Sequence, residues 1–441
     1  MDRLDAAVAT AILGLDTLWG GNVMDPSGTG RFIADSWFSD APLPEAYTLP
    51  AAAAVRAAGG LSASQPDREA IDAYLAAVDL ARAIAEVRAH AADLPALRAA
   101  YLLNLADSCG LMWALALERL GQGEPVSFAR AVLASCGEPP TPSNPRSKRE
   151  RLAALLGAAP DDLVEAADAW RRDRLVPRDS IRTLAGAFIA ELDALCQKNL
   201  LPHLPARLHE VPRANIEFLP IEDAWFSGSM NYLGRERDEA GRPLYEATYE
   251  INASLEISVP EFAQLVSHEV VPGHVTTFAL LQHLDHLGEI GFEATVQTMN
   301  TRGATLSEGI ANNALLIAYG VTEIEELPDE DLQIGLLLAL LQDDAKNQAA
   351  WLTWQEGWPQ EEVAPLLRRE FLVSEERAGK LSGAWARHPL MGRLYLPCYR
   401  AGTEKVAALR RLHPPGRLLP ALFGAQGLVD ITTLDLVLTR G

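Results

Sequence analysis

A proline–glycine pair between two histidines is the feature that most constrains how this chain can fold. The segment His268-Glu269-Val270-Val271-Pro272-Gly273-His274 continues an apolar helical pattern that begins near Pro260. Pro272 lacks an N–H, and its ring clashes with the carbonyl of the residue four positions back, which is His268. Gly273 permits backbone angles that other residues avoid. The sequence therefore predicts that the helix kinks, bulges or ends over residues 271–273.

The predicted break decides whether the two imidazoles can meet. On an unbroken helix of ~3.6 residues per turn, residues six apart point about 120° away from each other. His268 and His274 could not then reach the same ion, whereas a break can swing His274 back beside His268. Neutral imidazole is the commonest metal ligand in proteins. We therefore expect both histidines to bind one metal ion.

Two glutamates fall on apolar helix faces, where a carboxylate without a partner is costly. Glu269 lies within the apolar arc of the motif helix. Glu308 lies in the segment 305–312, which begins a helix that is apolar nearly all round and therefore buried. Catalytic zinc usually has three protein ligands and one open position. Glu308 is the predicted third ligand, Glu269 the predicted general base, and Asn312 is expected to orient a ligand.

Two tyrosines and several arginines are weaker candidates. Tyr395 and Tyr399 lie four residues apart, so they share a face if their segment is helical. A phenol near the metal could donate to the oxyanion of a tetrahedral intermediate, and the alternative is a tyrosine packed in the core or at its rim. Arg393, Arg400 or Arg302 could hold a substrate carboxylate through two hydrogen bonds, or could be surface or structural arginines.

Composition limits the partners and the location. The 441 residues are 49% apolar, which supports a sizeable core, and the net charge of −21 disfavours nucleic acid and anionic membranes. The N-terminus lacks the basic region of a signal peptide, and no apolar run reaches the ~18 residues of a membrane-spanning helix. Four separated cysteines do not suggest a disulfide framework. These features predict a cytoplasmic protein and leave the oligomeric state open.

The residue pattern predicts a mostly α fold. Strong helix formers at helical spacing dominate the first 210 residues and the chain after residue 258. Residues 211–258 instead hold aromatic and β-branched residues, with turn residues 238–241 between the strand-like segments 230–234 and 244–252. We expect a helical N-terminal region, 1–210, that walls a cleft. A catalytic region, 211–441, would carry a small antiparallel β element before the metal-binding helices, in one integrated domain.

The motif resembles a known bacterial family. His-Glu-x-x-Pro-Gly-His, followed by Glu308-Gly309 in a buried helix, is similar to the family called domain of unknown function 885. Its members are regarded as zinc metallopeptidases with the mostly helical architecture of the carboxypeptidase Taq family and other gluzincins. The resemblance covers mainly residues 225–410, including the Tyr-x-x-Gly element Tyr399-Arg400-Ala401-Gly402. It implies that His268, His274 and Glu308 are zinc ligands and that Glu269 is the base.

The chain departs from that family at three places near the motif. Val270 stands where alanine is frequent, Val275-Thr276-Thr277 replaces a histidine-containing stretch, and Ile310 replaces a common tryptophan. These departures leave the substrate class open.

Together the residues and the resemblance predict zinc-dependent hydrolysis of peptide bonds in short peptides, of carboxypeptidase or oligopeptidase type. One Zn²⁺ per chain would polarise the scissile carbonyl and bring the pKa of a water molecule to around 7, and Glu269 would accept its proton. Two alternatives stay open: a metal-dependent hydrolase of a non-peptide amide, and a non-catalytic protein that retains the fold. The sequence lacks a glycine-rich phosphate loop and a Gly-x-Ser-x-Gly motif, which disfavours nucleotide and serine hydrolysis.

Overall fold

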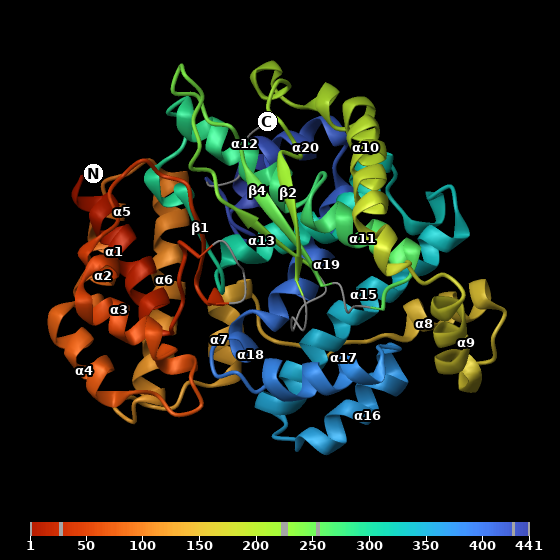
Figure 1. Ribbon diagram of the computed structural model, residues 1–441, viewed down its shortest axis with the longest axis horizontal. Helices are drawn as coiled ribbons and strands as arrows, with labels where there is room; N and C mark the ends of the chain where they lie inside the picture. The colour runs from red at the N-terminus through yellow and green to blue at the C-terminus, as the bar shows by residue number, and fades with distance from the viewer. Residues whose placement is uncertain (1, 26–29, 222–227, 253–255, 426–427, 440–441) are drawn as a thin grey trace.

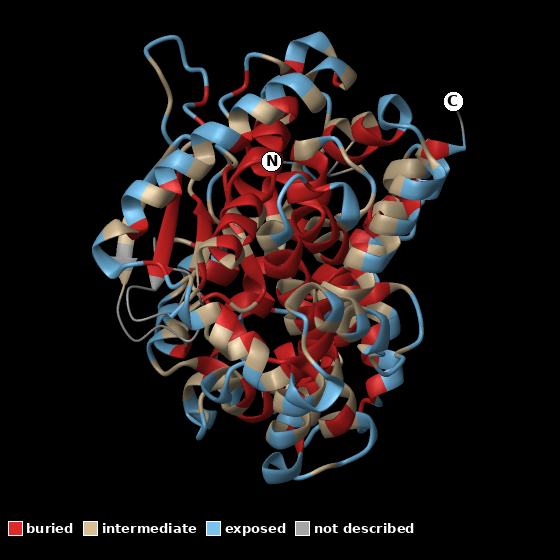
Figure 2. Cartoon of the chain, turned by 90° about the vertical axis from the view of Figure 1, so that its right-hand side faces the viewer, coloured by how far each residue is buried: buried red, intermediate tan, exposed pale blue. Residues whose placement is uncertain are grey.

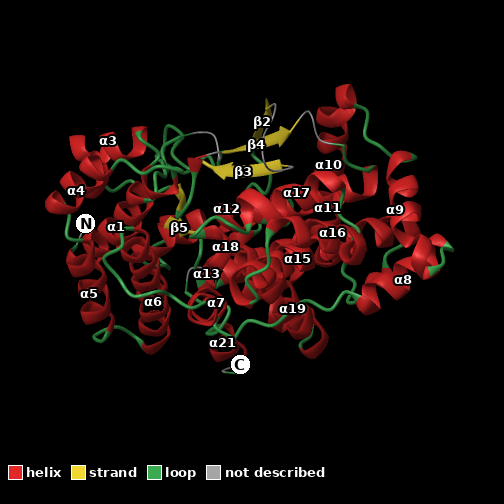
Figure 3. Cartoon of the chain, turned by 90° about the horizontal axis from the view of Figure 1, so that it is seen from below, coloured by secondary structure: helices red, strands yellow, loops and turns green. Residues whose placement is uncertain are grey.

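The computed structural model describes residues 2–25, 30–221, 228–252, 256–425 and 428–439. Helices dominate these residues, and the strands among them are short, which confirms the predicted mostly α fold (Figures 1 and 3). Buried residues run through the middle of the molecule, and exposed residues lie mainly on its periphery (Figure 2).

The first six helices, at the left of Figure 1, supply most of one hydrophobic cluster. They are α1 (Arg3–Leu18), α2 (Glu45–Thr48), α3 (Pro50–Ala57), α4 (Arg68–Ala77), α5 (Leu80–Ala91) and α6 (Ala96–Arg119). α1 begins with a reciprocal pair of side-chain caps between Asp2 and Asp5. Near its other end, the buried Asp16 carboxylate accepts the N–H groups of Ile33 and Ala34. These bonds fix the start of strand β1 (Ala34–Trp37).

One helix, α6, is long and apolar enough to cross a membrane by length and composition alone, and half of its most apolar stretch is buried inside the protein. Core helices of globular proteins meet the same criterion, because they too are apolar along most of their length.

Two small sheets are described. β1 pairs antiparallel with β5 (Val296–Thr298), with Trp37 opposite Val296, and this joins the first 40 residues to the region of the motif. The sequence predicted a helical region over residues 1–210, so strand β1 is a correction. Its partner lies some 260 residues away, and such a pairing leaves no local turn signal.

The second sheet has the order β2-β4-β3, from β2 (Ile216–Ile221), β4 (Ala247–Asn252) and β3 (Gly228–Tyr232). β3 and β4 are antiparallel as predicted, with Met230 opposite Tyr249. β2 lies parallel to β4, so the predicted antiparallel element is a mixed sheet. The prediction missed β2 because parallel strands are joined by a crossover rather than by a recognisable tight turn.

Five helices below the sheet in Figure 3 carry the candidate site or support it. They are α11 (Val259–Glu269), α12 (His274–His286), α13 (Arg302–Asn312), α15 (Glu330–Ala350) and α19 (Leu396–Leu412). α11 starts where predicted, because the hydroxyl of Ser258 accepts the N–H of Glu261 and Pro260 occupies the first turn. α19 packs against both α13 and α15.

Two glycines let α13 and α19 approach closely. A Cβ on Gly402 would lie 2.0 Å from the carbonyl oxygen of Thr305, and a Cβ on Gly309 would lie 2.4 Å from that of Gly402. Contacts this short exclude any side chain at either position. The crossing therefore holds Glu308, on α13, beside the tyrosines at the start of α19.

The remaining helices complete the fold. They are α7 (Phe128–Cys136), α8 (Arg146–Leu156), α9 (Leu163–Arg172), α10 (Ile181–Asn199), α14 (Ala314–Tyr319), α16 (Gln360–Phe371), α17 (Glu375–Lys380), α18 (Met391–Leu394), α20 (Pro415–Gly424) and α21 (Leu434–Leu438). Two further hydrophobic clusters each combine residues from both sides of residue 210. Residue 210 is therefore not a boundary between cores.

Candidate metal centre

The helical pattern of the motif breaks where the sequence predicted. α11 ends at Glu269 and α12 begins at His274, with the Pro–Gly pair between them. The N–H of Gly273 donates to the carbonyl of Ser267 at 3.0 Å. A Cβ on Gly273 would lie 1.7 Å from the carbonyl oxygen of His268, so only glycine fits. The break places His274 Nε2 at 3.2 Å from His268 Nε2.

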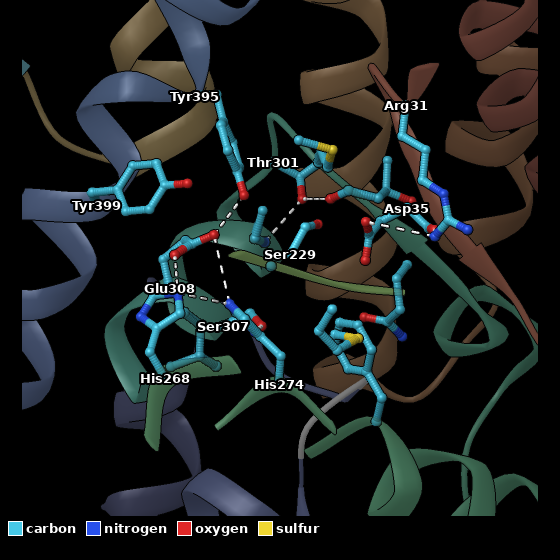
Figure 4. A pocket seen from close by; sticks show the side chains of 18 of the residues that line it. Arg31, Asp35, Ser229, His268, His274, Thr301, Ser307, Glu308, Tyr395 and Tyr399 are labelled. Atoms are coloured by element: carbon cyan, nitrogen blue, oxygen red, sulfur yellow. Dashed lines mark hydrogen bonds and ion pairs between the residues drawn. The ribbon is translucent and has the colours of Figure 1, made fainter. Parts of the chain in front are cut away.

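Glu308 completes a compact set of donor atoms with these imidazoles (Figure 4). Its Oε2 lies 3.4 Å from His268 Nε2, and its Oε1 lies 3.8 Å from His274 Nε2. Ligand atoms of a tetrahedral zinc ion with bonds of about 2.1 Å are about 3.4 Å apart. Glu308 Oε2 is also buried without a hydrogen-bond partner among the described residues. Both the spacing and this unpaired oxygen fit a zinc ion.

A second carboxylate, that of Glu269, lies near the same imidazoles. The nitrogens of His268 and His274 and a Glu269 oxygen all lie within 4.8 Å of one another, so distance alone does not exclude Glu269 as a ligand. We favour Glu308 because its oxygens are closer to both imidazoles. Glu269 Oε2 instead accepts the N–H of Met230, on β3, at 3.2 Å.

Neighbouring side chains contact both candidate histidine ligands. His268 Nδ1 lies 2.8 Å from Asn312 Oδ1, and His274 Nδ1 lies 3.2 Å from Ser307 Oγ. The amide nitrogen of Asn312 donates to Thr403, so its oxygen accepts from the imidazole. The proton on His268 Nδ1 leaves His268 Nε2 as an acceptor, and the Nε2 atoms of both histidines face Glu308. Asn312 therefore contacts His268, and its role in orienting a metal ligand stays a prediction.

The electrostatics of the centre favour a bound cation. Burial, together with the charge of His274, lowers the pKa of His268 to about 3. Burial also acts to lower the pKa of His274, but the adjacent Glu308 carboxylate outweighs it and raises this pKa to about 9. Burial acts to raise the pKa of Glu308, but His274, His268 and Tyr395 lower it to about 2. The carboxylates thus draw positive charge into the centre, as a divalent ion would supply.

Glu269 differs from Glu308 in its ionisation. Burial raises the pKa of Glu269 to about 7, and the nearby His274 only partly opposes this effect. A carboxylate that titrates near neutrality can accept and return a proton within one reaction cycle. The prediction that Glu269 faces the interior beside the histidines therefore agrees with its position.

The two tyrosines lie beside the centre, edge to face, with ring centroids 5.2 Å apart. Tyr395 donates its hydroxyl hydrogen to Glu308 Oε1, so it holds the candidate ligand. Tyr399 lines the cavities on both sides of the centre, and the ammonium of Lys346 lies 3.2 Å from its ring centroid. Of the two, Tyr399 has the position from which a hydroxyl can reach a substrate.

The structure does not bring the predicted arginines to the centre. Arg393 is buried and bonded to Glu118, and Arg400 pairs with Glu404 and the carbonyl of Thr141. Arg302 donates to Asn104. These arginines join elements of the fold to one another, which their sequence context did not reveal. Besides Glu269 and Glu308, two charged side chains line the cavity next to the centre, Arg31 and Asp35, which come from the N-terminal region and were not predicted.

Two cavities meet at the candidate centre. The first cavity, of about 160 Å³, extends toward Arg31 and Asp35. The second cavity, of about 190 Å³, extends toward Lys346 and Asp343. Both are lined by His268, Glu269 and Tyr399, together with Gly228 of β3. His268 and Glu269 therefore lie between the two cavities, and His274 and Glu308 line the first of them.

Comparisons with known proteins support the fold only. No protein-family profile matches the sequence, and no curated protein matches it. A solved structure from Colwellia psychrerythraea, described as a candidate lipoprotein, is similar with a TM-score of 0.51 at 14% identity. The match covers 81% of this chain and 66% of the Colwellia protein. A candidate lipoprotein of unknown function from Shewanella oneidensis gives a TM-score of 0.49 at 15% identity, covering 90% and 79% of the two chains.

Proposed function

We propose that this protein is a zinc-dependent hydrolase of peptide bonds in short peptides, related to the metallopeptidase family that its motif resembles. The observation that carries the proposal is the position of His268 Nε2, His274 Nε2 and the Glu308 carboxylate, at 3.2–3.8 Å from one another. A zinc ion held by them would supply a Lewis acid that polarises a carbonyl and acidifies water.

The side chains around the centre suit the remaining steps. Glu269, with a pKa raised by burial to about 7, accepts a proton from the attacking water and returns it to the leaving amine. Tyr399 donates to the oxygen that becomes negative in the tetrahedral intermediate. Tyr395 keeps Glu308 in place.

An edge strand can hold the substrate. β3 is an edge of the described β2-β4-β3 sheet, and its residues Gly228, Ser229 and Met230 line the first cavity. An extended peptide can add to such an edge through backbone hydrogen bonds. This arrangement favours a peptide over a non-peptide amide, which has no repeating backbone to pair.

The proposal is tested by zinc content and peptide hydrolysis in one set of variants. Glu269→Gln should retain about one zinc ion per chain and lose about 10²–10⁴-fold in kcat. His274→Ala should lose both zinc and turnover. His286→Ala is the matched control, because His286 is exposed at the end of the same helix. Zinc that persists in His274→Ala contradicts the ligand set.

The same assay separates the alternatives. Turnover of non-peptide amides but not of short peptides would overturn the peptidase assignment. Zinc binding without turnover of either class would identify a non-catalytic protein that keeps the fold.

The cytoplasmic location stays a prediction. The similar protein from Colwellia psychrerythraea is described as a candidate lipoprotein, and at 14% identity it is evidence for the fold alone.

A further inference from the structure

One carboxylate in the first cavity has no part in the proposed mechanism. Asp35 is the second residue of β1, and its side chain is 25% exposed where it lines the cavity shared with Glu269 and His274. Among the described residues, its nearest cationic atom is Arg31 Nη1, which lies 4.0 Å from Asp35 Oδ1. That separation is too long for a hydrogen bond. A partly buried carboxylate without donors is unfavourable unless a ligand supplies them.

Arg31 holds the backbone of Asp35 in place and is too buried to contact a substrate itself. Its side chain is only 2% exposed, and its guanidinium donates to the backbone carbonyls of Asp35 and Asp25. In Figure 4, Arg31 and Asp35 lie on one side of the cavity, and Glu308 and Tyr395 lie on the other. Of the pair, Asp35 is the side chain that faces the open space.

The charge around Arg31 is negative overall. Among the described residues, the charged groups that act most strongly on its guanidinium are three carboxylates and one arginine: Asp35, Asp16, Glu250 and the exposed Arg235. Burial raises the pKa of Asp35, and Arg31 only partly opposes this effect. A positively charged group would therefore be stabilised at this end of the cavity, and a second carboxylate would be repelled.

We infer that Asp35 determines specificity by binding a cationic nitrogen of the substrate, either the terminal ammonium of a short peptide or a lysine or arginine side chain. The inference rests on the proposed peptidase function, because that function makes the cavity a substrate site. The negative charge also disfavours a substrate carboxylate at this end of the cavity. The sequence had instead suggested that an arginine could hold a substrate carboxylate.

The test compares Asp35→Asn with Asp40→Asn. Asparagine keeps the shape of aspartate and removes its charge, and Asp40 is a matched control because it lies just beyond β1, 81% exposed and paired with Arg237. The ligands are a neutral peptide with a free amino terminus, its N-acetylated form, and an N-acetylated peptide that contains lysine. Kinetics use the zinc-loaded enzyme. Calorimetric binding uses zinc-loaded Glu269→Gln, so that binding is measured without turnover.

Asp35→Asn should weaken binding of a cationic peptide by about 10- to 100-fold, the usual range for a hydrogen bond to a charged group. The loss should fall mainly on KM, and binding of the N-acetylated neutral peptide should not change. Asp35→Glu should restore part of the loss, and thermal unfolding checks that each variant is folded. Weaker binding of the peptide with a free amino terminus identifies the terminal ammonium as the group that Asp35 binds. Weaker binding of the lysine peptide alone identifies a side chain as that group.

Equal losses for cationic and neutral peptides, or no loss for either, would overturn the role of Asp35. This failure differs from failure of the proposed function. Turnover that is independent of Asp35 overturns only the specificity inference. Charge-dependent peptide binding at Asp35 without any hydrolysis overturns only the peptidase assignment.

Discussion

Each candidate ligand has a neighbouring side chain that contacts it, and these contacts determine what the loss of that neighbour should do. Tyr395 donates to Glu308, Asn312 accepts from His268, and Ser307 lies at 3.2 Å from His274 Nδ1. Such partners fix the direction in which a ligand atom points and raise its affinity for a metal. Their loss should weaken metal binding more than it destabilises the fold.

Tyr395→Phe tests this at the level of one hydroxyl. It removes the donor to Glu308 and keeps the ring, so zinc affinity should fall about 10-fold or more. Zinc affinity is measured by competition with a chromophoric chelator. The matched control is Tyr319→Phe, which removes a similar tyrosine–glutamate bond, to Glu191, on the exposed surface. Equal zinc affinities in the two variants would show that Tyr395 does not position Glu308.

At the scale of elements, the site depends on one helix break and one close helix crossing. The break was predictable because proline and glycine act on their own neighbours. The interior positions of Glu269 and Glu308 were also predictable, because both lie on apolar helix faces. The strand that carries Asp35 was not, because it pairs with β5 far along the chain. The arginines were assigned from charge alone, and the sequence did not show that Glu118 and Glu404 engage them.

Gly273→Ala tests the break. A Cβ there would lie 1.7 Å from the backbone of His268, so the turn must open and His274 must move from His268. We expect destabilisation of about 1–3 kcal/mol, as for other overpacked sites, together with loss of zinc binding. Chemical denaturation and zinc analysis measure the two effects. Gly186→Ala, on α10 with no heavy atom within 4 Å of the new Cβ, should be neutral or slightly stabilising.

Gly402→Ala tests the crossing of α13 and α19. The added methyl would meet the carbonyl oxygen of Thr305 at 2.0 Å and force the helices apart, which separates Glu308 from Tyr395. Zinc affinity should fall about as far as in Tyr395→Phe, by about 10-fold, and stability should fall by about 1–3 kcal/mol. Gly379→Ala, on α17 with open space around its Cβ, is the control. Unchanged zinc affinity in Gly402→Ala would show that the crossing does not determine the position of Glu308.

At the scale of the whole molecule, distant parts of the chain meet at the cleft. The candidate ligands come from α11, α12 and α13, which contribute to one hydrophobic cluster, and Asp35 comes from the region packed around another. The β1–β5 pair and the bond from Arg98 to Glu293 join these two regions. Metal binding should therefore stabilise the cluster around α11, α12 and α13 directly, and the N-terminal helices indirectly through contacts such as these.

Removal of zinc tests whether a metal ion at this centre stabilises the folded state. A ligand at about 100 times its Kd stabilises the folded state by about 2.7 kcal/mol. At about 2.1 cal/mol/K per residue, the unfolding entropy of the 441 residues is about 0.9 kcal/mol/K, so Tm should fall by about 3 °C when a chelator removes zinc. His274→Ala should start near the lower Tm and show no further fall with chelator, and His286→Ala should behave as the unmodified protein. A chelator shift of the same size in His274→Ala would place the stabilising metal at another site, because that variant lacks a donor atom of this centre.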